Sequence, residues 1–443
     1  MKIIHCLNQY MPLACAGTEI YVHTLATMQK SYAHEVAVIT PHIDYYRPGK
    51  IDSHYMYEWI DVYQFLETGN PKDKQVHYGK KKPAGLDNFK QLIVTLEPDV
   101  IHFHELNRSI GFTTEHVKIA RQYGSKVFLT MHLSSYTCNT NILVRDGKIC
   151  DGKIREMACT ECCYKTNFKL SLLLAKPLTA LSVFCLYSGI TGLLGDGKAT
   201  TLMMIPTTIK RVKNELKELV QNLDQFICYA KWYEKILIEN GVPNNKITIV
   251  PEALVTVKKY VGKKLTAIPA LPLKMVFVGR IQQTKGIHLV IEAMQQFSAQ
   301  QVQIDLYGRP EETAYYSKCF EDSLGYDNIN WKGEIDRGEV LACLAQYDIF
   351  CLASTFSEMS PLVIQEAFSV GLPVLASKVY GNIEQVTDGY NGMLFEFNSS
   401  KSLAQKIKEL VNNPWLVQQM KNNVEAPLHF EEVNAAYLDL YTS

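Results

Sequence analysis

The sequence lacks a net charge, and this absence narrows the classes of protein that it can encode. Its 443 residues include 45 Lys and Arg and 45 Asp and Glu, so the formal net charge is zero. A non-specific nucleic-acid binder needs a broad excess of positive charge, so we expect no nucleic-acid partner. With 47% hydrophobic and 20% charged residues, the composition is that of a folded protein. At roughly 100–200 residues per domain, this length predicts two or three domains.

Cysteines and long apolar runs are also scarce. The 12 cysteines are too dilute for a disulfide scaffold. The apolar run Ile3–Leu7 is too short for the core of a secretion signal, so we expect a cytoplasmic location. The uncharged run Leu178–Gly195 includes Thr, Ser, Tyr and Gly residues, which makes it weakly apolar for a membrane span. It predicts a buried helix or a surface that touches one lipid monolayer.

Short apolar runs alternate with helical patterns in both halves of the chain. In the first half the predicted strands are Lys2–Leu7, Glu35–Thr40, Asp99–Phe103 and Lys126–Thr130. In the second half they are Met275–Val278, Val302–Tyr307, Asn328–Trp331, Asp348–Leu352 and Val374–Ala376. This alternation predicts parallel sheets in two α/β domains. We place these domains at residues 1–255 and 273–425, joined by a linker at 256–272.

A loop with two cations follows the predicted strand Met275–Val278. Arg280 and Lys285 lie between Gly279 and Gly286, just before a predicted helix. Loop amides and helix N-termini attract phosphate, and Arg and Lys neutralise it. The loop does not have the spacing of a Walker motif. Taken alone, it is compatible with a phosphate site or with a solvated loop that carries incidental charges.

Two glutamates flank the start of a helix that follows the predicted strand Asp348–Leu352. Glu358 precedes Pro361, which suits the first turn of a helix, and Glu366 lies about two turns along. Their carboxylates would then be on the order of 10 Å apart. This separation is too long for a glycosidase pair, but it suits the two hydroxyl-bearing ends of one long ligand. The alternative is that Glu366 is an ordinary helix residue.

Together these motifs resemble those of GT-B glycosyltransferases of the GT4 group, which are retaining enzymes that use nucleotide-sugar donors. The resemblance is strongest over Val276–Phe395, which also contains Gly371-Leu372-Pro373 and Asp388-Gly389-Tyr390-Asn391-Gly392. Weaker matches are Ala16–Glu19, Asp99–His104, Thr130–His132 and Phe226–Pro251. The resemblance implies two Rossmann-like doubly wound domains with an inter-domain cleft, the first on the acceptor side and the second binding the nucleotide-sugar. The closing segment, residues 426–443, resembles the family's last helix, which returns to the first domain.

The resemblance implies donor-binding roles for five residues of the second domain. Arg280 and Lys285 would bind the donor diphosphate, with the backbone amides of Ser360 and Leu362 near the phosphate. Glu366 would hold the ribose hydroxyls.

It also implies roles for Gly17, His132 and Glu358. Gly17 would let a loop of the first domain approach the donor closely. Glu358 would hold the hydroxyls of the transferred sugar, and His132 would point at the same sugar, so these two are the catalytic candidates. The sequence departs from the family pattern at Ala16, where a glycine is usual, at Met359, where a glycine is common, and at Tyr380-Gly381, where two glycines are common.

The resemblance therefore implies a hexosyltransferase of polysaccharide biosynthesis, which moves a sugar from a UDP- or GDP-sugar to a glycan or lipid-linked glycan acceptor. The sequence has no Asp-x-Asp motif, so we expect no catalytic metal and no cofactor beyond the nucleotide-sugar co-substrate. Two alternatives stay open, a GT-B nucleotide-sugar epimerase and an inactive glycan-binding homologue. Glu358 and Glu366, with seven residues between them, form a Glu-x7-Glu motif that argues against the epimerase. The presence of Arg280, Lys285 and Glu358 argues against the inactive homologue.

Two clusters in the first domain indicate further ligands. Thiolates suit structural zinc, and Cys159-x2-Cys162 is a common half of such a site. We predict a structural zinc site from Cys138, Cys150, Cys159 and Cys162. The alternatives are a set with Cys163 as a substitute ligand, free thiols, or a disulfide.

The basic runs Lys80–Lys82 and Lys210–Lys217, with the apolar stretch Leu178–Leu194, predict a surface for anionic lipids. The protein would then be peripheral on the inner face of the membrane. The alternative is a solvated face beside a core helix.

His102 and His104 alternate at the end of a predicted strand. One of them is therefore a candidate for contact with the acceptor. The alternative is that both are core histidines.

Overall fold

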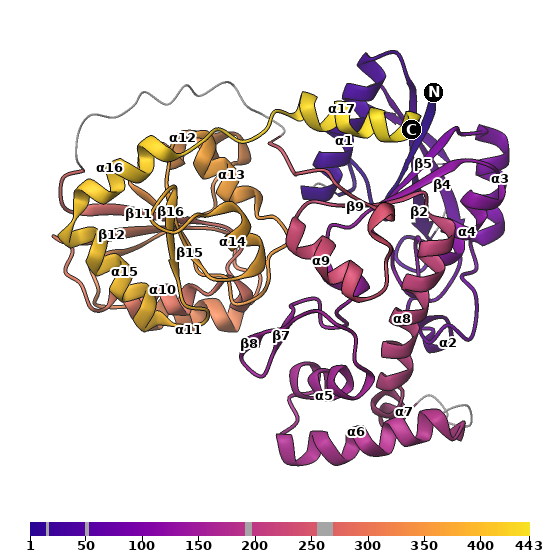
Figure 1. The fold of residues 1–443 in the computed structure, drawn as a ribbon, viewed down its shortest axis with the longest axis horizontal. Coiled ribbons are helices and arrows are strands. Elements are labelled where there is room, and N and C mark those ends of the chain that lie inside the picture. Colours follow the sequence, from indigo (N-terminus) through magenta and orange to yellow (C-terminus); the bar gives the residue numbers. More distant parts are fainter. Residues whose placement is uncertain (15–16, 49–52, 191–196, 255–268) are drawn as a thin grey trace. The chain divides into compact units, whose positions relative to one another are not determined.

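The computed structural model describes residues 1–443 except 15–16, 49–52, 191–196 and 255–268 (Figure 1). Contacts within the chain divide it into two units. The first comprises Met1–Leu143, Asp151–Pro251 and Phe430–Ser443, and the second comprises Val144–Cys150 and Glu252–His429. Most of the linker expected at 256–272 lies outside the described residues, as does Ala16.

The first unit is built on an eight-stranded sheet with the order β10-β9-β6-β5-β1-β2-β4-β3. The strands are β1 (Lys2–Cys6), β2 (Glu35–Ile43), β3 (His54–Tyr57), β4 (Ile60–Glu67), β5 (Val100–His104), β6 (Lys126–Thr130), β9 (Gln225–Cys228) and β10 (Ile247–Ile249). Neighbouring strands are parallel except β3 and β4. The winding reverses between β1 and β5, which is the place where open α/β sheets bind ligands.

Helices connect these strands, and the longer ones bury apolar side chains on one face. They are α1 (Gly17–Ser31), α2 (Lys74–His77), α3 (Leu86–Leu96), α4 (Thr114–Gln122), α5 (Glu156–Asn167), α6 (Leu172–Tyr187), α7 (Lys198–Met203), α8 (Ile205–Asn222), α9 (Lys231–Glu239) and α17 (Phe430–Thr442). In α1 the buried side chains include Tyr21, Leu25 and Gln29, whose spacing of four places them on one face. The C-terminal helix α17 packs against α1, where the Tyr21 hydroxyl donates to the Tyr437 hydroxyl at 3.0 Å.

The second unit contains a six-stranded parallel sheet with the order β13-β12-β11-β14-β15-β16. Its strands are β11 (Leu273–Val278), β12 (Val302–Tyr307), β13 (Ile329–Gly333), β14 (Ile349–Leu352), β15 (Val374–Ser377) and β16 (Gly392–Phe395). Its helices are α10 (Ile287–Met294), α11 (Thr313–Ser323), α12 (Val340–Leu344), α13 (Leu362–Ser369), α14 (Tyr380–Gln385), α15 (Ser400–Asn412) and α16 (Pro414–Asn423). A short hairpin of β7 (Val144–Arg145) and β8 (Lys148–Ile149) groups with this unit.

Both units therefore have the doubly wound, Rossmann-like architecture that the alternating pattern predicts. In the second unit β14, β15 and β16 are buried along their whole length, as expected for strands covered on both faces. The winding reverses between β11 and β14, so the loops after these two strands lie at the switch point. The α/β prediction is confirmed, whereas the inter-domain cleft stays a prediction.

The chain between β6 and β9 forms an excursion of helices α5 to α8 that the sequence did not predict in detail. Helix α6 covers much of the uncharged run, whose last residues, 191–195, lie outside the described residues. One face of α6 is buried, yet Leu173 is 87% exposed and Phe184 is 65% exposed. Half of this helix is thus a surface and not core. In the part of the chain that the structure describes, no helix has the length and apolarity needed to cross a membrane.

Candidate functional site

The loops after β11 and β14 are joined by backbone contacts. The Thr355 amide donates to Thr284 O at 2.8 Å, and Thr355 Oγ1 donates to Gln283 O at 3.1 Å. Gly286 has a φ of +69°, and a Cβ at this position would lie 1.9 Å from Ala353 O. Only glycine can adopt this conformation at this distance. The glycine that closes the cationic loop is therefore what lets the two loops touch.

This contact brings Lys285 and Glu358 together. Lys285 Nζ donates to Glu358 Oε1 at 2.6 Å, with side chains 16% and 9% exposed. Ser354 Oγ donates to the same oxygen at 2.6 Å, and the ammonium lies 5.3 Å from the centre of the Phe356 ring. An ammonium has three donors and a carboxylate accepts several hydrogen bonds, so both groups keep capacity for a ligand.

The remaining predicted residues of this unit are Ser360, Leu362 and Glu366, which lie at the start of α13, and Arg280, which follows β11. Arg280 is exposed, and Leu362 begins the helix after Pro361, which is its N-cap residue. Glu366 lies only one turn inside the helix, which corrects the expected two turns, because the helix starts at Leu362. Burial raises the pKa of Glu366, and Arg337 opposes this shift.

Two residues near the site were missed from the sequence. Glu252 lies close to Ser360, and burial raises the pKa of Glu252 to about 8 while its hydrogen bond with Ser360 lowers it. The Glu252 carbonyl oxygen accepts from Gln365 Nε2 at 2.9 Å. A Cβ on Gly381 would lie 2.4 Å from Glu358 O, so this glycine supports the backbone that carries the acidic candidate. Its place beside Tyr380, where the family often has two glycines, was the available signal.

In the first unit, His132 follows β6 and is half-buried. Its Nδ1 lies 3.0 Å from the Tyr229 hydroxyl, and its Nε2 lies 3.4 Å from His104 Nδ1. Desolvation lowers the pKa of His132 to about 3, so the imidazole is neutral near pH 7. Gly17 begins α1 and is exposed, and no described atom lies within 4 Å of where a Cβ would be. Packing within the described residues therefore does not require glycine there.

His102 and His104 are both buried, and the structure joins them with His5, which the sequence did not single out. One ring nitrogen of each lies within 4.8 Å of the others. His102 bonds Thr130 Oγ1 through Nε2 at 2.7 Å and the Tyr441 hydroxyl through Nδ1. His102 is thus a satisfied core histidine.

The four predicted cysteine ligands are not assembled in the described structure. Among the residues it describes, His5, His102 and His104 are the one group of three or more potential ligands with ligand atoms this close together. Cys159 and Cys162 lie on α5, and together with Cys138 they are near enough to Cys163 to raise the pKa of its thiol, after burial and against an Asn139 hydrogen bond. Cys150 lies in the segment that groups with the second unit.

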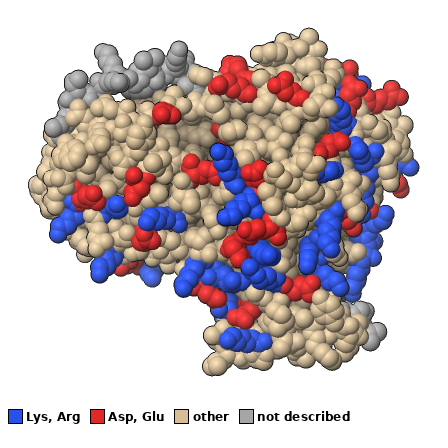
Figure 2. Space-filling model, viewed as in Figure 1, with Lys and Arg blue, Asp and Glu red and all other residues tan. Residues whose placement is uncertain are grey.

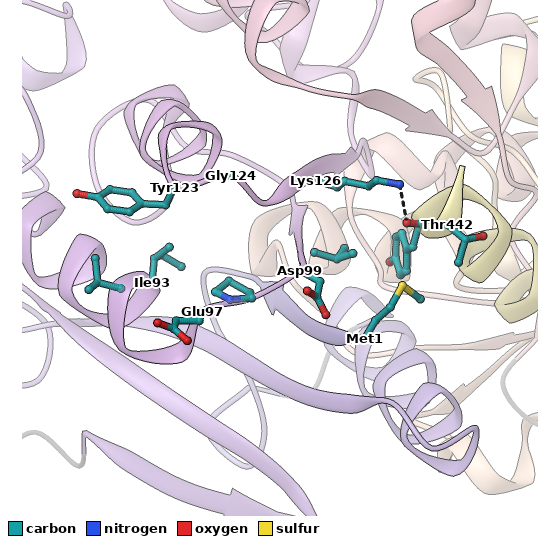
Figure 3. Close-up of a pocket in the computed structure, with 12 residues that line it drawn as sticks. Met1, Ile93, Glu97, Asp99, Tyr123, Gly124, Lys126 and Thr442 are labelled. Atoms are coloured by element: carbon teal, nitrogen blue, oxygen red, sulfur yellow. Dashed lines mark hydrogen bonds between the residues drawn. The ribbon is translucent and has the colours of Figure 1, made fainter.

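A pocket of about 800 Å³ lies at the other end of the first sheet (Figure 3). Met1, Asp99 and Lys126 line it at the amino-terminal ends of β1, β5 and β6. Lys126 Nζ donates to Tyr441 O at 3.1 Å across its edge. Because ligands of such sheets bind at the carboxyl ends of the strands, we do not count this pocket as part of the site.

Residues 263–426 match the family model described as glycosyl transferases group 1. This region is a group 1 glycosyltransferase domain. A similar protein is the putative colanic acid biosynthesis glycosyltransferase WcaL of Salmonella typhimurium, 29% identical over 202 residues, which are 44% of this chain and 49% of that protein. The GtfA subunit of Streptococcus gordonii, a UDP-N-acetylglucosamine–peptide N-acetylglucosaminyltransferase, is 30% identical over 38% of this chain and 33% of its own length. The chain thus spans half or less of these two relatives.

Solved structures resemble the whole chain, glycosyltransferase domain included. Anabaena HepE, in complex with UDP and glucose, has a TM-score of 0.61 at 16% identity and full coverage of both chains. Sucrose-phosphate synthase from Thermosynechococcus elongatus has a TM-score of 0.65 at 17% identity, covering 100% of this chain and 98% of that one. The predicted GT-B fold is confirmed, while membership of the GT4 group stays a prediction.

The loop contact in the glycosyltransferase domain yields a test with a matched control. Gly286→Ala should destabilise the domain by about 3 kcal/mol, because a left-handed alanine costs roughly 1–2 kcal/mol and the clash with Ala353 adds overpacking. Gly371 has a similar φ of +73° but nothing within 4 Å of its Cβ position, so Gly371→Ala should cost only about 1 kcal/mol. Urea unfolding measures both. Equal destabilisation of the two variants would contradict the proposed backbone contact.

Proposed function

We propose that this chain is a retaining GT4-type glycosyltransferase that moves a sugar from a UDP- or GDP-sugar to a glycan or lipid-linked glycan. The observation that carries the proposal is the Lys285–Glu358 pair at the switch point of a group 1 glycosyltransferase domain. The similarity to HepE, whose structure holds UDP-glucose, supports a nucleotide-sugar donor. The similarity to WcaL, named for colanic acid biosynthesis, supports a glycan product.

The chemistry of the pair fits the departure of a diphosphate. As the bond between sugar and phosphate breaks, negative charge grows on the leaving group. Fixed cations such as Lys285 and Arg280 stabilise that charge. The backbone amides of Ser360 and Leu362 lie at the N-terminal end of α13, which also favours a bound phosphate. Glu358 then binds hydroxyls of the transferred sugar and Glu366 those of the ribose.

The stereochemical part of the proposal is retention by attack on the front face of the sugar. In this mechanism a leaving phosphate oxygen takes the proton of the acceptor hydroxyl as the new glycosidic bond forms. His132, neutral and half-buried, contacts the sugar as a hydrogen-bonding group and not as a charged acid. NMR of the anomeric centre of the product distinguishes retention from inversion. An epimerase would instead convert the nucleotide-sugar without an acceptor, and an inactive homologue would leave it unchanged.

Nucleotide binding tests the donor site directly. At a concentration of 100 times the dissociation constant, a ligand stabilises the folded protein by about 2.7 kcal/mol. We expect UDP or GDP to raise the melting temperature, and Lys285→Ala, Arg280→Ala or Glu358→Ala to largely abolish transfer. The two cation variants should also lose the nucleotide-induced shift. Thermal shift with UDP, GDP and ADP, followed by transfer assays, measures these effects.

A second ion pair of the same unit supplies the control. Lys421 Nζ lies 2.9 Å from Asp348 Oδ1, with side chains 11% and 18% exposed, and Asp348 stands just before β14, at the opposite end of the strand from the site. Lys421→Met should lower stability and keep the nucleotide-induced shift. Near wild-type turnover in Lys285→Ala, or loss of nucleotide binding in Lys421→Met, would remove the predicted pair from the site.

We propose in addition that the first unit docks on anionic membrane lipids through the outer face of α6. This face carries Leu173, Leu174, Leu181, Phe184 and Tyr187, each more than half exposed. The surface that α6 forms, at the bottom of Figure 2, is mostly uncharged. Such a row of large apolar side chains on a solvent-facing helix marks an interaction site.

A charged pocket adjoins this apolar face. Its volume is about 330 Å³, and its lining combines the cations Lys81, Lys82, Lys210 and Arg211 with Glu115, Glu215 and Glu218. The two basic runs noted in the sequence thus meet in one place. Lys210 Nζ also lies 5.0 Å from the centre of the Tyr187 ring on α6. Cations beside an apolar helix face match the chemistry of an anionic lipid surface.

Vesicle co-sedimentation tests this surface. At about 1.5 kcal/mol per buried side chain, Leu173→Ser with Phe184→Ser should weaken binding on the order of 100-fold. Leu324→Ser with Phe320→Ser, which alter exposed apolar residues of the second unit, should leave binding unchanged. Lys81→Ala with Lys210→Ala should reduce binding to phosphatidylglycerol vesicles more than to phosphatidylcholine vesicles. Vesicle binding that does not change with anionic-lipid content or salt concentration would argue against docking on anionic lipids through this surface.

The cysteines form a separate, structural part of the proposal. We propose that Cys138, Cys150, Cys159 and Cys162 hold a structural zinc ion, with Cys163 as the substitute ligand. Thiolates bind Zn²⁺ in closed tetrahedra and add to stability. Elemental analysis of the purified protein should find about one zinc per chain, as expected for one four-ligand site. Cys159→Ser should lower that content, whereas Cys343→Ser, in α12, should not. A protein purified without zinc that also fails to take it up would contradict this proposal.

A further inference from the structure

We propose that Gln29, His5 and His104 are positioning residues that fix the tautomer of His132, placing its proton on Nε2. Four hydrogen bonds connect Gln29, His5, His104, His132 and Tyr229 in one line, which we call the histidine relay. His5 Nε2 lies 2.8 Å from Gln29 Oε1, and His5 Nδ1 lies 3.0 Å from His104 Nε2. His104 Nδ1 lies 3.4 Å from His132 Nε2, and His132 Nδ1 lies 3.0 Å from the Tyr229 hydroxyl.

The line forms because the neighbouring strands β1 and β5 carry His5 and His104, and His132 lies just after the adjoining strand β6. His5 of β1 is the register partner of His102 in β5, and His104 of β5 is the partner of Thr130 at the end of β6. His132 follows Thr130 by two residues, and Gln29 comes from the buried face of α1. The residues of the relay are therefore fixed by regular secondary structure and not by loops alone.

The Tyr229 hydroxyl also lies 3.4 Å from His132 Nε2, but its nearer contact is with Nδ1. Only two arrangements of protons satisfy the four links given above. A neutral imidazole carries one proton, so a nitrogen that accepts leaves the other to donate. With Gln29 Oε1 as the acceptor, His5, His104 and His132 each donate through Nε2, and Tyr229 donates to His132 Nδ1. With the amide reversed, all three rings would donate through Nδ1. The orientation of a single buried amide thus selects the tautomer of three histidines.

Burial strengthens this control. His5, Gln29 and His104 are 1% exposed or less, so water does not compete for their hydrogen bonds, and desolvation keeps the rings neutral. The alternative use of this cluster is a metal site, since His5, His102 and His104 have nitrogens within 4.8 Å of one another. Both nitrogens of His102 are already bonded to Thr130 and Tyr441. The described contacts therefore favour the relay.

This inference deepens the proposed function and rests on it, because His132 is the residue assigned to the transferred sugar. With the proton on Nε2, that N–H donates to His104 Nδ1 over a long distance of 3.4 Å, so a sugar hydroxyl can share the proton as the second acceptor of a three-centre hydrogen bond. With the proton on Nδ1, the same nitrogen would accept instead. The relay would thereby decide which hydrogen-bonding pattern His132 presents.

The tautomer is read directly by ¹⁵N NMR of histidine-labelled protein, through long-range couplings of the ring nitrogens. We expect His132, His104 and His5 to carry their protons on Nε2. His116 is an internal reference, because its Nδ1 accepts from the Thr113 amide at 3.1 Å, which leaves the proton on Nε2. A wild-type His132 with its proton on Nδ1 would overturn the proposal.

Substitution of the amide tests the direction of control. Gln29→Met removes the acceptor at similar volume, and His132 should then populate both tautomers. Asn434→Leu changes another buried amide, whose two polar atoms have no hydrogen-bond partner among the described residues, and should leave His132 as in the wild type. A Gln29→Met protein that is folded by circular dichroism and keeps one His132 tautomer would refute the relay. Histidine signals of the wild type that shift on addition of Zn²⁺ alone would assign the cluster to metal instead.

Donor binding gives the functional consequence. If half of the His132 population in Gln29→Met has the wrong tautomer, the apparent dissociation constant for the nucleotide-sugar should rise about twofold. UDP alone, which lacks the sugar, should bind as in the wild type. An unchanged sugar-dependent affinity with a mixed tautomer would overturn the link to the sugar. A protein that binds no nucleotide at all would refute the proposed function, while the NMR result would still decide the relay.

Discussion

The contact between the loops after β11 and β14 is the constraint on which the proposed donor site depends. Gly286 rests against Ala353, and Gly381 rests against the carbonyl of Glu358. Without side chains at these two glycines, the backbones come close enough for Lys285 to reach Glu358. Two opposite charges that are mostly removed from water must satisfy each other. The short ion pair and the glycines are therefore one arrangement and not two separate features.

Most of the second unit could be predicted from the sequence, for a physical reason. Strands buried on both faces read as continuous apolar runs, and the residue after each run must lie at the carboxyl edge of the sheet. Arg280, Lys285 and Glu358 could be placed on that basis. Glu252 could not, because its contact with Gln365 joins residues 113 positions apart and no local pattern signals it.

The first unit was harder to predict because its polar features depend on register and coverage. His5 looks like one more residue of an apolar run until β1 is paired with β5, where it faces His102. The apolar run that includes α6 has the same composition whether another element covers it or not. Only the packing around the helix shows that Ala175 and Ser182 are buried while Leu173 and Phe184 are exposed. Composition indicated that the run was apolar, but not which face would meet solvent.

The family match and the features described in the first unit fall in different parts of the chain. The family match covers 263–426, which lies in the second unit, where backbone contacts leave little freedom to vary. The buried tyrosines of α17, the histidine relay and the outer face of α6 all belong to the first unit. Tyr437 and Tyr441 anchor the end of the chain to Thr130 and His102, next to His104 at the end of β5 and to His132, which follows β6. A change in α17 would therefore reach His132 through hydrogen bonds and not through the Lys285–Glu358 pair, so the two parts of the proposed site can vary independently.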